Sequence, residues 1–285
     1  MARILVVGGT GTVGSAVVSQ LLNDEHEVRV LTRDPDNAAA KLGDKVEIME
    51  GDVTIPRNVE DAMFNIEVVF SSLSSPPGKK NITDIEYGGN LVLLEASKHQ
   101  RVKRFLYVSV MNAEYFAGYP RFFVKYKVEE ELKISGLPYT FFRPTIFMET
   151  LPRFINKGKA IVYGNQPHPI HFLAVADLAK VVAESLKRKE SMNAVFDVMG
   201  PEPMTFDDAL GMFKRYRRPK MKIEHSSLLW GRALGYVYMK KQPELAELVT
   251  LMNECETTPE KGDPSLTQTL FGPPATRLHD WLLDY

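Results

Sequence analysis

Short apolar runs alternate with amphipathic stretches along the first half of the chain. The runs are almost continuously apolar, which is typical of strands buried on both faces of a parallel sheet. They predict six strands, at residues 3–7, 27–31, 46–50, 67–71, 104–109 and 139–143. The stretches between them predict helices at residues 12–23, 35–42, 56–63, 81–99 and 121–135. Such alternation favours right-handed crossovers and therefore an α/β fold with a doubly wound parallel sheet of the Rossmann type.

Residues with strong capping and turn preferences support these boundaries. Asp34 followed by Pro35 is typical of a helix start, because aspartate caps the first turn and proline fits its first position. Gly136 followed by Pro138 indicates the end of the preceding helix. Residues 74–80, rich in serine, proline and lysine, predict a loop over the sheet edge.

The pattern changes after about residue 145. It predicts two short strands at 160–163 and 194–198 and an amphipathic helix at 174–188. Thr205 opens a capping box, with aspartate in place of glutamate, for a helix that ends near Tyr216. We therefore predict a Rossmann-type domain over residues 1–150. A smaller α+β lobe over residues 151–285 would pack closely over the strand ends and would not be an independent domain.

Composition and charge narrow the range of partners. The chain has 285 residues, of which 44% are hydrophobic and 25% charged, and its formal net charge is −1. A charge so close to zero gives no long-range attraction to nucleic acid, so no nucleic-acid partner is expected. The single cysteine, Cys255, excludes an intramolecular disulfide and suits a reducing compartment.

Targeting signals are not visible in the sequence. The apolar run after Met1 stops at Gly8, which is too short for a signal peptide. No stretch reaches the ~20 apolar residues that a membrane span needs. We expect a cytoplasmic protein, whose only candidate for membrane contact is the apolar stretch 228–241 with its terminal lysines.

The sharpest motif follows the first predicted strand, where residues 8–14 read GGTGTVG. Glycines at 9, 11 and 14 satisfy G-x-G-x-x-G, and those at 8, 11 and 14 satisfy G-x-x-G-x-x-G. One glycine turns the chain out of the strand, one lets backbone N–H groups approach a pyrophosphate, and one lets the helix pack on the sheet. The positive end of the helix favours phosphate as well. We predict dinucleotide contacts at Gly8, Thr10, Gly11, Thr12, Val13 and Gly14.

The end of the second strand bears on the choice between NADP and NAD. Thr32 stands where NAD-binding proteins usually place an acid, and Arg33 follows it directly. A guanidinium there can bind a 2′-phosphate, whereas an acid would repel it. Asp34 is a rival acidic residue, 20 residues after Gly14, but it is better placed to cap the next helix. We expect NADP, with NAD as the less favoured cofactor; an ordinary solvated arginine is the alternative for Arg33.

Two further strand ends supply candidate cofactor contacts. Asp52 could accept from an adenine amino group while Val53 packs on the ring, although Asp52 could equally cap the helix near Pro56. Ser71 and Ser72 end the fourth strand, where small residues either leave room for a cofactor or start a turn.

Several segments together resemble the NmrA-like branch of the atypical short-chain dehydrogenase/reductases. They are residues 8–14, 31–35, 51–53, 101–109, 135–140 and 143–149, and the resemblance extends over roughly residues 1–215. It implies an NAD(P)-binding Rossmann domain with a substrate cleft over the strand ends. The family includes isoflavone-reductase-like and quinone-reductase-like enzymes, but also redox sensors and assembly factors. It further implies nicotinamide contacts at Pro144, Thr145 and Phe147; core packing is the alternative for Phe147.

The catalytic signature of short-chain dehydrogenases, Tyr-x-x-x-Lys, is incomplete here. Lys125 and Ser109 fit the family lysine and serine, but Arg121 stands four residues before the lysine. Tyr119 lies six residues before it, off its helical face. The resemblance implies that Lys125 serves the ribose hydroxyls and polarises a carbonyl; a surface lysine paired with Glu129 is the alternative. For Ser109 the alternative is a buried hydroxyl at the strand end.

Metal chemistry is not expected, since His168 and His171 lack an evident third ligand, and His171 is better suited to anchor a turn near Asp177. Two functions stay open. One is an NADPH-dependent reductase of a small carbonyl, quinone or enone. The other is a dinucleotide-sensing regulator or scaffold that binds a protein partner without turnover. The stretch 228–241 either rests on a membrane or partner, or covers the substrate cleft.

Overall fold

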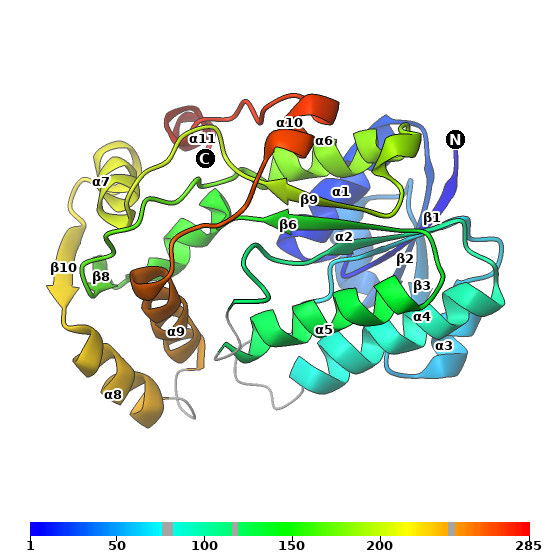
Figure 1. Ribbon diagram of the computed structural model, residues 1–285, viewed down its shortest axis with the longest axis horizontal. Helices are drawn as coiled ribbons and strands as arrows, with labels where there is room; N and C mark the ends of the chain where they lie inside the picture. Colours follow the sequence, from blue (N-terminus) through cyan, green and yellow to red (C-terminus); the bar gives the residue numbers. More distant parts are fainter. Residues whose placement is uncertain (76–81, 116–118, 239–242) are drawn as a thin grey trace.

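A sheet of seven parallel strands forms the centre of the protein in the computed structural model, which describes residues 1–75, 82–115, 119–238 and 243–285 (Figure 1). Its strand order is β3-β2-β1-β4-β5-β6-β9. The strands are β1 (Arg3–Val7), β2 (Glu27–Thr32), β3 (Glu47–Glu50), β4 (Val68–Ser71), β5 (Arg104–Val108), β6 (Tyr139–Pro144) and β9 (Ala194–Val198). A second, three-stranded sheet contains β7 (Ile155–Asn156), β8 (Lys159–Tyr163) and β10 (Lys222–Ser226).

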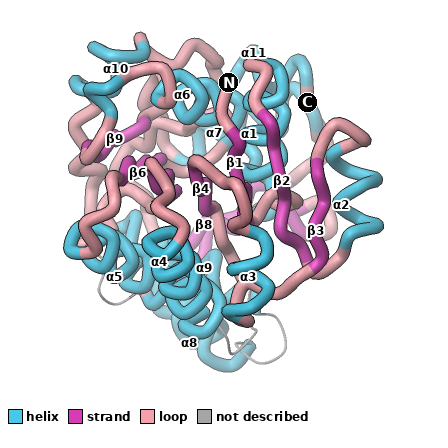
Figure 2. Tube along the Cα trace, turned by 90° about the vertical axis from the view of Figure 1, so that its right-hand side faces the viewer, coloured by secondary structure: helices cyan, strands magenta, loops and turns pink. Residues whose placement is uncertain are grey.

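Helices cover both faces of the large sheet (Figures 1 and 2). One face carries α1 (Thr12–Asn23), α2 (Pro35–Leu42) and α6 (Val175–Ser185), and the other carries α3 (Pro56–Ala62), α4 (Gly89–His99) and α5 (Pro120–Ile134). The remaining helices are α7 (Phe206–Arg217), α8 (Leu228–Tyr238), α9 (Pro243–Thr257), α10 (Ser265–Phe271) and α11 (Leu278–Asp284). Short 3₁₀ segments are η2 (Met148–Phe154) and η3 (Lys189–Ser191).

The predicted doubly wound α/β architecture is therefore confirmed, and the six strands expected in the first half begin and end within one residue of their predicted positions. The core strands are buried on both faces, as their continuous apolar runs require. The strand order reverses between β1 and β4, and their carboxyl ends flank a crevice. Ligands of open α/β sheets bind at such a point.

The segment before α4 differs from the predicted continuous helix over residues 81–99. Residues Ile82–Gly88 form a π-helix, η1, and the α-helix begins only at Gly89. Gly89 packs so closely that a Cβ there would lie 2.8 Å from Val53. Of the predicted loop 74–80, residues 76–80 lie outside the described part of the chain.

The C-terminal half is less separate from the sheet than its changed sequence pattern implies. The strand predicted at 194–198 is β9, which pairs in parallel with β6 rather than with the smaller sheet. The predicted helix 174–188 is α6, which packs on α1. The smaller lobe consists mainly of η2, β7, β8, β10 and the helices α7, α8, α9 and α11 around one apolar cluster. The capping box at Thr205 is confirmed, with reciprocal bonds to Asp208. Among the described residues, no helix combines the length and apolar character needed to cross a bilayer.

Candidate cofactor and substrate site

The glycine loop between β1 and α1 has the tight geometry that its sequence predicts. Gly8 adopts φ +84°, and a Cβ there would lie 2.8 Å from the carbonyl oxygen of Ser72. A Cβ on Gly14 would lie only 2.1 Å from the carbonyl oxygen of Gly8, so this glycine sets the close contact between helix and loop. Gly11 caps α1 without a side-chain hydrogen bond. The first N–H groups of the helix are thus available to an anion.

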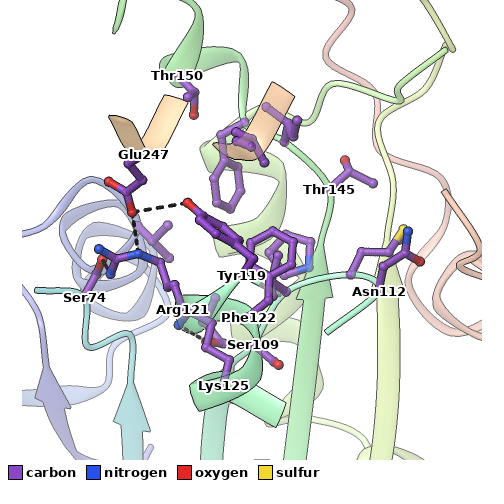
Figure 3. Close-up of a pocket in the computed structure, with 18 of the residues that line it drawn as sticks. Ser74, Ser109, Asn112, Tyr119, Arg121, Phe122, Lys125, Thr145, Thr150 and Glu247 are labelled. Atoms are coloured by element: carbon purple, nitrogen blue, oxygen red, sulfur yellow. Dashed lines mark hydrogen bonds and ion pairs between the residues drawn. The ribbon is translucent and has the colours of Figure 1, made fainter. Parts of the chain in front are cut away.

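A cavity of about 650 Å³ extends from this loop, past the carboxyl ends of β5 and β6, to helix α9 (Figure 3). Ten of the predicted site residues line it, and they come from five separate segments of the chain: Gly11, Thr12, Val13, Gly14, Ser72, Ser109, Lys125, Pro144, Thr145 and Phe147. The carboxyl ends of neighbouring parallel strands meet at one edge of the sheet, which brings these distant segments together.

The other predicted residues do not line this cavity. Gly8 and Thr10 lie in the glycine loop itself. Ser71 is fully buried, and its hydroxyl donates to Asn90 Oδ1 at 2.7 Å. Val53 packs in the apolar cluster between the sheet and α3 and α4. These contacts give Ser71 and Val53 structural roles whether or not a cofactor is bound.

The adenosine end of the candidate site lies beyond β2. Arg33 is exposed there, and Asp34 caps α2 by accepting from Asn37 N at 3.0 Å. Lys41 Nζ donates to the carbonyl oxygen of Thr10 at 2.7 Å. This second cation beside the glycine loop was missed in the sequence, since nothing in its local pattern marks it.

Asp52, at the end of β3, makes a local turn rather than capping the helix near Pro56. Its Oδ1 accepts from the backbone N of Thr54 at 2.9 Å and from its hydroxyl at 2.8 Å. Burial disfavours its charged form, but these hydrogen bonds and the Arg33 charge outweigh that cost and lower the pKa of Asp52. Asp52 is therefore an ionised acceptor near Arg33.

Lys125 points from α5 to the end of β5 rather than to solvent. Its Nζ donates to the carbonyl oxygen of Val108 at 3.1 Å and lies 5.5 Å from the centroid of the Tyr107 ring. Burial lowers the pKa of Lys125. The alternative of a surface pair with Glu129 is wrong, because Arg143 binds both carboxylate oxygens of Glu129, at 2.9 and 2.6 Å. Lys125 is thus a half-buried cation at the cavity wall.

Two hydroxyls in the cavity wall lack partners within the described chain. Ser72 Oγ follows β4 and Ser109 Oγ follows β5, and both atoms are buried without a hydrogen bond. Buried polar atoms are almost always paired in folded proteins, so unpaired ones that face a cavity indicate a polar ligand. Together with the open glycine cradle, they fit a dinucleotide laid across the strand ends.

Tyr119 is a cavity residue that the spacing rule missed. It immediately precedes α5, as its N-cap residue, so its side chain is not bound to the helical face of Lys125. Its ring packs against Phe122 with centroids 4.6 Å apart, and its hydroxyl donates to Glu247 Oε1 at 3.3 Å (Figure 3). Burial and the Glu247 charge raise the pKa of Tyr119, so the phenol keeps its proton at neutral pH.

Arg121, which stands where the Tyr-x-x-x-Lys pattern would place a tyrosine, joins α5 to α9 across the cavity. Its Nε donates to Glu247 at 2.6 Å, and its Nη1 pairs with Glu86 and donates to Ser74 Oγ at 3.1 Å. Its Nη2 donates to the carbonyl oxygen of Ser75 at 3.1 Å. Two carboxylates thus neutralise this guanidinium, which holds the wall together rather than offering a free charge to substrate.

Helix α9 supplies the outer wall, for which residues 228–241 were one candidate. Its cavity residues are Glu244, Glu247, Leu248, Leu251 and Cys255. Helix α8 packs on α9 instead, and its Leu229 and Trp230 side chains are 75% and 68% exposed. Residues 239–242 lie outside the described chain. Burial raises the pKa of Cys255 to about 12, so its thiol remains protonated.

The two histidines play separate roles. His168 lines the cavity, whereas His171 Nδ1 lies 2.8 Å from Glu260 Oε2. The partner of His171 is therefore Glu260 and not Asp177, which accepts from the backbone N of Thr276 at 2.8 Å. Within the described ranges, His, Cys, Asp and Glu side chains form no group of three or more that could hold a metal ion.

Comparison with known proteins places the chain among relatives of two kinds. It is 28% identical to the photosystem II assembly factor Ycf39 of Cyanophora paradoxa over 77% of this chain and 70% of that protein. It is 25% identical to the (4-alkanoyl-5-oxo-2,5-dihydrofuran-3-yl)methyl phosphate reductase of Streptomyces griseus subsp. griseus, over 99% and 97%.

Among solved structures, the triphenylmethane reductase of Citrobacter sp. complexed with NADP(H) superposes with a TM-score of 0.78 at 19% identity, and 98% of each chain is covered. A likeness at this identity concerns the fold. The NmrA-like family model matches residues 1–259, which include the glycine loop, Lys125 and the whole of α9. The chain therefore belongs to the NmrA-like family.

Proposed function

We propose that the protein is an NADPH-dependent reductase of a small carbonyl, quinone or enone. The observation that carries this proposal is the continuous cavity, which joins the glycine loop to a chamber whose polar wall residues include Ser109, Tyr119 and Lys125. A pocket that is mostly apolar, with a few convergent polar side chains and a lysine of lowered pKa, is the usual form of an enzyme site.

The cofactor would lie across the strand ends. In this proposal the start of α1 binds the pyrophosphate, Arg33 and Lys41 lie near the adenosine 2′-phosphate, and Thr145 and Phe147 lie beside the nicotinamide. In the same proposal Lys125, which lines the cavity, binds the ribose hydroxyls. When bound, the nicotinamide supplies the hydride for reduction.

The substrate would occupy the chamber between α5 and α9, where Phe122, Leu248 and Leu251 provide apolar contacts. Reduction of a carbonyl places negative charge on its oxygen, which then needs a proton. The protonated Tyr119 hydroxyl is a suitable donor, and Lys125 of α5 adds positive charge to the same cavity. A tyrosine at the helix N-cap would thus replace the tyrosine that position 121 lacks.

The proposal is tested by mixing purified protein with NADPH and a panel of quinones, enones and aldehydes, and following the loss of NADPH absorbance. Turnover that requires both substrate and protein is the expected result. NADPH binding without turnover on any member of the panel would contradict it.

A second candidate function, a dinucleotide-dependent regulator or assembly factor, is favoured by one observation. Arg121 is committed to Glu86 and Glu247 and cannot act as the usual proton donor. The relative from Cyanophora paradoxa carries the name of an assembly factor. The exposed Leu229 and Trp230 would then be part of a surface for a protein partner. Tight cofactor binding without turnover supports this alternative.

Removing the Tyr119 hydroxyl should lower turnover while leaving cofactor binding intact. We expect Tyr119→Phe to reduce kcat for a carbonyl substrate by roughly 10²–10⁴-fold, the range of a positioned proton donor. Tyr126→Phe, on the same helix but outside the cavity lining, is the matched control and should keep native kcat. Steady-state kinetics measures kcat for both variants. An unchanged kcat in Tyr119→Phe would show that Tyr119 is not the proton donor.

The cofactor preference should depend on Arg33. We expect the native protein to bind NADPH more tightly than NADH, and Arg33→Ala to weaken NADPH binding by about 10- to 100-fold, as for loss of a charge-assisted bond. NADH binding should change little. Lys45→Ala, which removes an exposed cation at the other end of the β2–β3 pair, is the control. Calorimetric titration gives all these constants, and equal native affinities for the two cofactors would contradict the preference.

A further inference from the structure

A second cavity, of about 600 Å³, lies in the smaller lobe, away from the candidate active site. Its walls come from the turn between β7 and β8, the end of α7, the segment leading into β10, and Tyr285 after α11. These elements lie on the side of the molecule opposite β1–β3 (Figure 1). The volume is within the range of small-molecule sites.

The charge of this cavity is one-sided. Four of its lining residues are cations, namely Lys157, Arg217, Arg218 and Lys220, and none of the described residues that line it has an acidic side chain. Nor does any of the four form an ion pair in the described parts of the chain. The chain as a whole has a net charge of −1, so this concentration is local. Three of the four cations belong to residues 214–222, which read KRYRRPKMK and contain no acid.

One of these cations has an unused donor. The Nε atom of Arg217 is buried and has no hydrogen-bond acceptor within the described residues. Its guanidinium lies 5.9 Å from the ring centroid of Tyr285. A buried guanidinium N–H without an acceptor is costly, and an anion in the cavity would relieve that cost.

The helix dipole does not explain the whole cluster. Basic residues favour the C-terminal turn of a helix, and this accounts for cations in the last turn of α7. Lys157 and Lys220 lie on other segments, however, and converge on the same cavity. Repulsion between the four cations is therefore a cost that the dipole alone does not offset.

The rest of the lining is apolar and aromatic. Phe213 and Met221 are buried lining residues, Ile155 lines the cavity as well, and the ring centroids of Phe213 and Tyr285 are 5.6 Å apart. Inorganic phosphate alone would leave this surface uncovered. A ligand with both an anionic group and an apolar body matches both parts of the lining.

We propose that this cavity binds a phosphate-type anion carried on an apolar or aromatic body, held by Arg217, Arg218, Lys157 and Lys220. The source is either a soluble phosphorylated molecule or the headgroup of an anionic phospholipid, because both present the same group. The site is separate from the proposed reductase cavity and does not depend on turnover there.

The probe for the soluble source is phenyl phosphate, titrated calorimetrically at constant ionic strength beside phenol and inorganic phosphate. We expect phenyl phosphate to bind more tightly than either fragment, and its Kd to rise at least tenfold in Arg217→Gln/Arg218→Gln. Lys214→Gln/Arg215→Gln is the matched control, since it removes two charges from the same helix but none from the cavity lining. It should keep the native Kd within about twofold.

A second double variant guards against misfolding, because Arg217 packs near Tyr285. Lys157→Gln/Lys220→Gln changes only exposed turn residues and should also weaken binding of phenyl phosphate. The lipid arm compares sedimentation with phosphatidylglycerol-containing and pure phosphatidylcholine vesicles. Binding only to anionic vesicles, lost in the cavity variants and kept in the control, supports the lipid source. The site is disproved if neither probe binds the native protein, or if control and cavity variants lose binding equally.

Discussion

Replacing Gly11 by valine should abolish dinucleotide binding while the protein remains folded. The backbone at this position has φ −73° and ψ 172°, which a β-branched residue adopts readily. An added Cβ would meet only the carbonyl oxygen of Gly8, at 3.2 Å, so the loop must shift by a few tenths of an ångström to accept it. The valine methyls, however, would occupy the space in which a pyrophosphate must approach the N–H groups of α1.

A melting experiment with and without NADPH measures this effect. A ligand at 100 times its Kd stabilises the native protein by about 2.7 kcal/mol, and the Gly11 variant should lose that shift entirely. Gly211→Ala, in helix α7 with free space around its Cβ, should keep the full shift. Gly14→Ala should instead destabilise the fold itself, because its Cβ would lie 2.1 Å from Gly8 O. A native cofactor shift in folded Gly11→Val protein would refute the assignment of this loop.

Replacing Lys125 by methionine should cause the second large effect, on catalysis. Methionine keeps an apolar stem beside Tyr107 but removes the cation at the end of β5. If the protein reduces carbonyls, kcat/KM should fall by roughly 10²–10⁴-fold, because both ribose anchoring and carbonyl polarisation are lost. Since burial lowers the pKa of Lys125, its ammonium should begin to lose its proton at a lower pH than an exposed lysine, and activity should fall over that range.

The control substitution is at Lys127, about half a helical turn after Lys125. Lys127 is exposed on the same helix, with its ammonium 5.6 Å from the Phe123 ring. Lys127→Met should therefore leave kcat/KM unchanged while making the same chemical substitution. Native activity in the Lys125 variant, measured beside this control, would exclude Lys125 from the mechanism.

The local sequence pattern was sufficient to predict most strands of the large sheet and about half of the residues of the candidate site. Continuous apolar runs located β1–β6 because strands buried on both faces leave no polar positions. The glycines of the loop could be assigned in advance because only a residue without Cβ fits beside Ser72 O and Gly8 O. Asp34 capped α2 as its position before Pro35 predicted.

The features of the site that the sequence pattern did not predict depend on packing between segments far apart in the chain. The outer wall of the cavity comes from α9, more than 100 residues after Lys125, and is joined to α5 by the Arg121–Glu247 pair. No periodicity within α9 indicates which surface it covers. Helical spacing excludes Tyr119 because it places that residue off the face of Lys125, but an N-cap residue is not governed by that spacing.

The pairing of β9 with β6 fixes both ends of the segment between them. Residues 145–193 leave the sheet at Pro144 and return at Ala194, and the ladder from Thr140 to Pro144 holds those ends in register. Because both ends of this segment are held by the sheet, an insertion within it costs little loop-closure entropy. The cost is roughly 0.6 kcal/mol for each doubling of the length of the segment. Evolution can therefore remodel the cavity wall at η2 and His168 without disturbing the glycine loop. Conversely, a truncated protein ending at residue 150 would expose the edge of β6 and invite aggregation.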